Sequence, residues 1–117
     1  MGKVLIVEDE TDALQLLRWQ IEELGHQVMT ANTAAAALAI GRSFQPEALV
    51  TDYFLQGELN GLDVIEQLRS MNPKLRVVLI TGLLRNALTE EIRRLHDVPV
   101  LTKPFDMKRL KELISQR

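Results

Sequence analysis

Four runs of apolar residues recur along the chain, at positions 4–7, 48–50, 77–80 and 98–101. A continuous apolar run of this length is typical of a strand that is buried on both faces, as in a parallel sheet covered by helices. Residues 27–31 form a weaker candidate for one more strand. The pattern therefore predicts a sheet of five strands.

The stretches between the runs carry apolar residues three or four positions apart, which is the spacing of one helical face. Thr33 and Asp106 are expected to cap helices, because a side-chain oxygen there can accept the free N–H groups of a first turn. Five helices are expected: one with its stripe at positions 14, 17, 21 and 24, one over 34–44, one carrying positions 62, 65 and 68, one at about 86–95, and one over 106–114. Strict alternation of strands and helices predicts an α/β fold, which we assign to one domain over residues 1–117.

Polar groups follow four of the predicted strands: Glu8 and Asp9, then Asp52, then Thr81, then Lys103. The carboxyl ends of parallel strands share one edge of the sheet, and ligands bind in the crevice outside that edge. Each residue alone has an ordinary explanation, since acidic residues suit a helix start and lysine is usually a solvated surface charge. Their order at successive strand ends instead indicates a common site.

The chemistry of this set fits a divalent cation and a phosphoryl group. Two adjacent carboxylates repel each other unless a cation neutralises them, and Mg²⁺ prefers oxygen ligands. Asp52, placed against a phosphoryl donor, can act as a nucleophile and form an aspartyl phosphate. Thr81 can donate a hydrogen bond to a phosphoryl oxygen, and Lys103 can place an ammonium beside it.

Composition narrows the classes of function. The net charge of −2, with both signs interspersed, offers no basic surface for nucleic acid. The chain has no cysteine, which excludes disulfides and thiolate metal sites. No signal peptide and no apolar stretch of about 18 residues is present, so we expect a cytoplasmic protein without membrane contact.

With these residues in place, the chain resembles the receiver domain of two-component response regulators over essentially its whole length. The resemblance rests on the segments Lys3 to Glu10, Asp52 with the later Gly61, Ile80-Thr81-Gly82, and Lys103-Pro104-Phe105. It implies a flavodoxin-like fold with strand order 2-1-3-4-5. It also implies phosphoryl transfer from a histidine kinase or histidine phosphotransfer protein, and a dimer that forms on phosphorylation is one further expectation.

The resemblance also assigns roles to residues. Asp52 would be the phosphoacceptor, and Thr81 and Lys103 would contact the phosphoryl group. Glu8, Asp9 and Asp52 would hold Mg²⁺ together with the backbone carbonyl of Phe54. The Lys103–Pro104 bond would be cis. The domain would catalyse its own phosphorylation only, so we do not expect a turnover enzyme.

The chain departs from the family pattern at two places, and a third feature bears on the lifetime of the phosphoryl form. One residue is inserted near Gly57, and positive φ angles at Gly57 and at Asn60-Gly61 are expected to absorb it. Val100 replaces the aromatic residue that many receivers carry three positions before the lysine, which predicts a muted switch because valine is short and stiff. Phe54 and Leu83 occupy positions that, in this family, flank the path of hydrolytic water; both are apolar and cannot orient water, which predicts a long-lived phosphoryl form.

Three alternatives were weighed. A phosphatase of the haloacid dehalogenase kind needs an aspartate at position 54, where this chain has Phe54. A cobalamin-binding domain needs an Asp-X-His loop, which is absent from the sequence. A phosphorylation-independent interaction module of the same fold stays open. The sequence also leaves open whether the receiver stands alone or belongs to a larger regulator.

Overall fold

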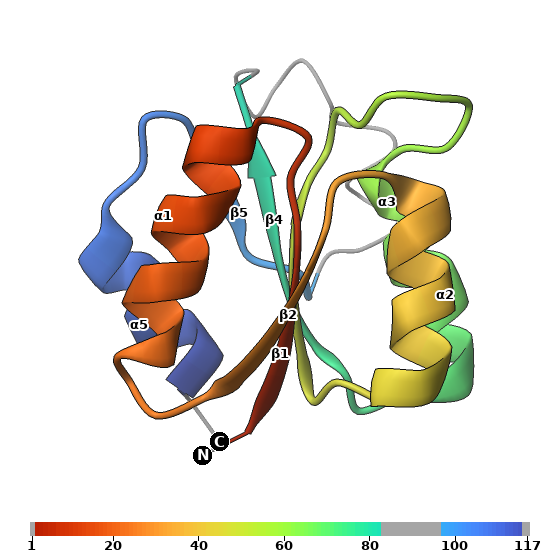
Figure 1. Ribbon diagram of the computed structural model, residues 1–117, viewed down its shortest axis with the longest axis horizontal. Helices are drawn as coiled ribbons and strands as arrows, with labels where there is room; N and C mark the ends of the chain where they lie inside the picture. The colour runs from red at the N-terminus through yellow and green to blue at the C-terminus, as the bar shows by residue number, and fades with distance from the viewer. Residues whose placement is uncertain (1, 83–96, 116–117) are drawn as a thin grey trace.

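A computed structural model describes residues 2–82 and 97–115 of the chain. Its five strands form one parallel sheet in the order β2-β1-β3-β4-β5, which is the order that the resemblance to receiver domains implied (Figure 1). The strands are β1 (Lys3–Val7), β2 (Gln27–Ala31), β3 (Ala48–Asp52), β4 (Arg76–Thr81) and β5 (Val100–Thr102). The described helices are α1 (Thr11–Glu22), α2 (Ala34–Phe44), α3 (Gly61–Met71) and α5 (Met107–Ser115). The helix predicted at 86–95 and the position of Leu83 lie outside the described residues.

The helices cover both faces of the sheet, with α1 and α5 on one side and α2 and α3 on the other (Figure 1). In β1, Val4 and Ile6 belong to the core beneath α1 and α5, whereas Leu5 and Val7 belong to the core beneath α2 and α3. All four side chains are at most 1% exposed. Successive side chains of a strand point to opposite faces, so a continuous apolar run is what a central strand covered on both sides requires.

β5 differs from its prediction, because it begins at Val100 rather than at Val98 and its three residues are only half-buried. Pro99 has no N–H to donate to β4, so it pairs with β4 through its carbonyl, which accepts the Leu79 N–H at 3.0 Å. β5 is also an edge strand with a neighbour on one side only. A run of apolar residues therefore overstated both the length and the burial of this strand.

Local hydrogen bonds at the helix starts confirm the two predicted caps. The Thr33 hydroxyl accepts the Ala36 N–H at 3.1 Å, and an Asp106 carboxylate oxygen accepts the Lys108 N–H at 3.0 Å. None of the helices in the described ranges has the length and apolar character that a membrane crossing requires.

The loop between β3 and α3 confirms one part of its prediction and corrects another. Gly57 has a φ of 103°, as expected for the inserted residue. Asn60, in contrast, has a φ of −109° and caps α3 through a reciprocal pair of hydrogen bonds. The Asn60 side chain accepts the Asp63 N–H, and the Asp63 side chain accepts the Asn60 N–H. Gly61 is required for space, since a Cβ there would overlap the carbonyl oxygen of Asp52.

Candidate functional site

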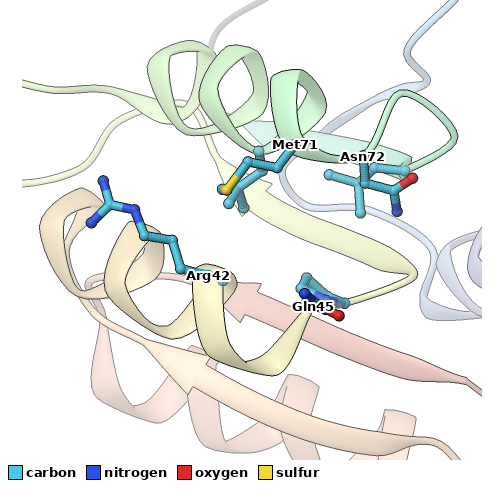
Figure 2. A pocket seen from close by; sticks show the side chains of 8 residues that line it. Arg42, Gln45, Met71 and Asn72 are labelled. Atoms are coloured by element: carbon cyan, nitrogen blue, oxygen red, sulfur yellow. The ribbon is translucent and has the colours of Figure 1, made fainter.

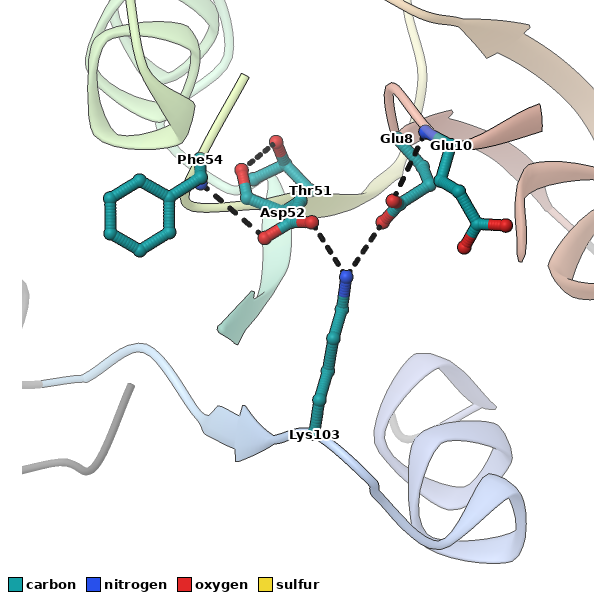
Figure 3. A network of polar contacts seen from close by, with 6 residues as sticks. All are labelled: Glu8, Glu10, Thr51, Asp52, Phe54 and Lys103. Carbon is teal, nitrogen blue, oxygen red and sulfur yellow. Dashed lines mark hydrogen bonds and ion pairs between the residues drawn. The ribbon is translucent and has the colours of Figure 1, made fainter. Parts of the chain in front are cut away.

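The polar residues predicted at the strand ends converge at the carboxyl edge of the sheet. The Lys103 ammonium lies 2.7 Å from the nearer Asp52 carboxylate oxygen and 3.4 Å from the nearer Glu8 carboxylate oxygen. Figure 3 shows Lys103 reaching from the segment after β5 into the space between the two carboxylates. Three segments that are distant in sequence therefore meet at one charged cluster, and the Lys103–Pro104 bond beside it is cis.

A group of three carboxylates forms the acidic side of this cluster. One carboxylate oxygen from each of Glu8, Asp9 and Asp52 lies within 4.8 Å of the others. Glu8 is 2% exposed, Asp52 is 5% exposed and Asp9 is partly buried. Oxygen donors of this kind at this spacing suit a hard divalent cation, so the donor set fits Mg²⁺.

Burial and mutual contact shift the pKa values of the charged groups in this cluster. It raises the pKa of Glu8 from 4.5 to about 7, and the charge and hydrogen bonding of Asp52 act in the same direction, against the opposing effects of Lys103 and the Glu10 N–H. Burial also opposes the charged form of Lys103, but the hydrogen bond and charge of Asp52, assisted by Glu8, raise the pKa of Lys103 above 10.5. The single ammonium thus satisfies Asp52 better than it satisfies Glu8, and further positive charge would be favourable.

Backbone contacts hold Asp52 at the end of β3. The Tyr53 N–H donates to the Ile80 carbonyl at 2.7 Å and so keeps the chain paired with β4 just beyond Asp52. The Phe54 N–H donates to one Asp52 carboxylate oxygen at 3.4 Å, while Lys103 contacts the other. The carboxylate is therefore oriented from both sides before any ligand arrives.

Thr81 and Phe54 occupy different environments. Thr81 is fully buried at the end of β4, and its carbonyl accepts the Lys103 N–H at 2.8 Å, which ties the lysine segment to β4. The Phe54 side chain is 53% exposed, and Figure 3 shows its ring on the side of Asp52 away from Glu8. The roles of the Thr81 hydroxyl and the Phe54 carbonyl stay predictions.

Two supporting groups escaped the sequence analysis. The Thr51 hydroxyl donates to the Asp52 carbonyl at 3.0 Å, and the Glu10 N–H donates to a Glu8 carboxylate oxygen at 3.3 Å. Thr51 gave no signal, because threonine is common in strands. The contact between Glu10 and Glu8 uses the backbone N–H of Glu10, which any residue except proline would offer, so the sequence could not indicate it.

Known proteins resemble this chain both in sequence and in fold. Residues 4–115 match the family model of the response regulator receiver domain. The chain is 40% identical over 81 residues to the alginate biosynthesis transcriptional regulatory protein AlgB of Pseudomonas syringae pv. tomato, a match that covers 69% of this chain and 18% of AlgB. It is 27% identical over 110 residues to the response regulator receiver protein CpdR of Brucella abortus, covering 94% of this chain and 91% of CpdR.

A solved structure supports the same fold. The crystal structure of a CheY-like response regulator receiver domain protein from Methanospirillum hungatei JF-1 matches with a TM-score of 0.87 at 23% identity, covering 97% of this chain and 90% of that one.

Proposed function

The chain belongs to the family of response regulator receiver domains, and from this premise we propose that it accepts a phosphoryl group on the Asp52 carboxylate. The observation that carries the proposal is the buried Asp52 carboxylate, which lies 2.7 Å from the Lys103 ammonium and beside two further carboxylates. A nucleophile, a fixed cation and a set of oxygen ligands are the groups that phosphoryl transfer requires.

The transfer step uses residues of this chain in distinct roles. A carboxylate oxygen of Asp52 attacks phosphorus, the phosphorus–nitrogen bond of a phosphohistidine breaks, and the departing imidazole nitrogen takes a proton. The Lys103 ammonium offsets charge on the phosphoryl oxygens, and the Thr81 hydroxyl donates a hydrogen bond to one of them. The product is an aspartyl phosphate that stays on the protein, so the domain is a signalling module rather than a turnover enzyme.

Glu8, Asp9, Asp52 and the Phe54 carbonyl are the groups that would hold Mg²⁺. When bound, the ion supplies positive charge to the transferring phosphoryl group. The burial of Glu8 supports this assignment, because the Lys103 ammonium lies 3.4 Å from the Glu8 carboxylate but 2.7 Å from that of Asp52.

The proposed donor is a histidine kinase or a histidine phosphotransfer protein. Family membership supports this partner, since receiver domains of two-component systems accept their phosphoryl group from phosphohistidine. We propose no nucleic-acid contact for this domain, because its charges are mixed and sum to −2.

Intact-mass spectrometry after incubation with Mg²⁺ and phosphoramidate tests the proposal. We expect one phosphoryl adduct on the wild-type protein, no adduct on Asp52→Asn, and no adduct when a chelator is added first. Glu10→Gln is the matched control, because Glu10 is exposed and neighbours the cluster, and it should be modified like the wild type. Absence of any adduct on folded wild-type protein would refute the proposal and favour a phosphorylation-independent interaction module.

A further inference from the structure

A cavity of about 310 Å³ lies between the C-terminal ends of α2 and α3. Pockets that bind small molecules in proteins begin at about 300 Å³ and are lined mainly by apolar side chains with a few polar groups. The floor of this cavity is apolar and is formed by Pro46, Leu68 and Leu75, all of them buried. Neither the strand-end residues nor the loop beside Asp52 line it.

The packing of the two helices explains why the cavity exists. At Gly41 the helices are in close contact, since a Cβ on this residue would lie 2.5 Å from a methyl carbon of Leu68. Beyond this contact both helices end. Gln45 turns the chain away from α2 with a φ of 51°, and Asn72 leaves α3 in an extended conformation. The space between the two exits is left unfilled.

The rim of the cavity carries one cation and no anion. Within residues 2–82 and 97–115, Arg42 is the only charged residue that lines the cavity, and no carboxylate there forms an ion pair with Arg42. Figure 2 shows Arg42 on α2 and Met71 on α3 reaching toward the same side of the opening, with Gln45 and Asn72 elsewhere on the rim. Met71 is 51% exposed, and the flexible thioether of methionine adapts to ligands of different shape.

We propose that this cavity binds a small organic carboxylate with an apolar body. The apolar body would displace water from the floor, and the planar guanidinium of Arg42 would pair with the carboxylate. A neutral ligand would leave the Arg42 charge without a partner, and a small inorganic anion would leave the apolar floor wet.

The cavity is independent of the phosphoacceptor. α3 begins at Gly61, beside the Asp52 carbonyl, and ends at Met71 beside the cavity, so the helix separates the two sites by its length. We therefore expect Asp52→Asn to bind the carboxylate as the wild type does. Failure of phosphorylation and failure of carboxylate binding are separate results.

NMR titration of the ¹⁵N-labelled protein with phenylacetate tests the proposal, with phenylacetamide as the neutral probe and acetate as the probe without an apolar body. Phenylacetate should shift amide signals at the C-terminal ends of α2 and α3, with a dissociation constant in the millimolar range that suits so small a ligand. Phenylacetamide and acetate should each bind more weakly. Arg42→Gln should weaken phenylacetate binding about fivefold, as expected for loss of one partly exposed ion pair.

Arg18→Gln is the matched control, because Arg18 is also exposed but lies on α1, across the sheet from the cavity (Figure 1). Equal binding of phenylacetate and phenylacetamide, or equal loss in the Arg18 and Arg42 variants, would overturn the proposal. Shifts confined to the acidic edge, or no shifts at all, would do the same. Shifts of the cavity residues on dilution without any probe would assign the cavity to contact between copies of the chain, and this also contradicts the proposal.

Discussion

Replacing Glu8 by glutamine should stabilise the metal-free protein at alkaline pH. Glu8 is 2% exposed, shares its surroundings with Asp52, and lies 3.4 Å from the Lys103 ammonium. These conditions raise its pKa from 4.5 to about 7, which means that the folded protein disfavours the ionised side chain. Glutamine has nearly the same shape, keeps an oxygen for the Glu10 N–H, and carries no charge.

The size and direction of the effect follow from this raised pKa. A difference between 4.5 and about 7 corresponds to about 3 kcal/mol when Glu8 is ionised in both the folded and the unfolded protein. Because the folded protein holds the proton more tightly, the stability that Glu8 contributes is complete below pH 4.5 and is lost as the pH rises through about 7. The advantage of Glu8→Gln should therefore be about 2–3 kcal/mol at pH 8 and only about 1 kcal/mol at pH 5.

Urea unfolding followed by circular dichroism, at both pH values and in the presence of a chelator, measures this effect. Glu10→Gln is the control and should match the wild type, because Glu10 is exposed. Mg²⁺ at 100 times its dissociation constant should stabilise the wild type by about 2.7 kcal/mol. It should stabilise Glu8→Gln less, because a ligand has been removed. A Glu8→Gln protein that is no more stable than wild type at pH 8, or a gain that does not change with pH, would refute the reasoning.

Four further variants examine the loop that follows the phosphoacceptor. Gly61→Ala should lose about 2–3 kcal/mol of stability and slow adduct formation, because its Cβ would overlap the Asp52 carbonyl oxygen. Gly57→Ala should lose only about 1 kcal/mol, because no atom lies near that Cβ and only the positive φ opposes it. Urea unfolding that ranks the two variants equally would count against this. Asn60→Ala should cost about 1 kcal/mol in the same assay through loss of the α3 cap, and an unchanged midpoint would disagree. Phe54→Asn should shorten the lifetime of the phosphoryl adduct, followed by intact mass after donor removal, because a polar side chain beside Asp52 can orient water; a lifetime equal to wild type would contradict the role of Phe54.

The sheet was predictable where burial on both faces dominates the choice of residues. Positions 77–80 are a continuous apolar run because β4 has strand neighbours on both edges and helices on both faces. The same signal misplaced the start of β5, since it could not weigh the missing N–H of Pro99 or the exposure of an edge strand. The caps at Thr33 and Asp106 were predictable because their hydrogen bonds are made within three residues of the chain.

The members of the candidate site were predictable from position, whereas their energetics were not. Alternation of strands and helices places Glu8, Asp52 and Lys103 at one edge whatever their side chains do. The preference of Lys103 for Asp52 over Glu8, and the burial that raises the pKa of Glu8, depend on packing around the cluster. The cavity beside Gly41 arises from contact between two helices and has no local sequence signature.

The muted switch that Val100 predicts stays a prediction. Val100 packs against the core beneath α2 and α3, and its side chain is short and stiff. We therefore expect any switch to use other groups, and the helix expected at about 86–95 lies outside the described residues.

The account rests on Asp52 as the acceptor of the phosphoryl group, and chemical trapping tests this most directly. Borohydride reduces an acyl phosphate to the alcohol, so treatment of the phosphorylated protein followed by peptide mass spectrometry identifies the modified carboxylate. We predict homoserine at position 52 alone, formed only after incubation with both Mg²⁺ and phosphoramidate. Homoserine formed elsewhere, or a reduced product derived from Glu8 or Asp9 in place of Asp52, would contradict the account.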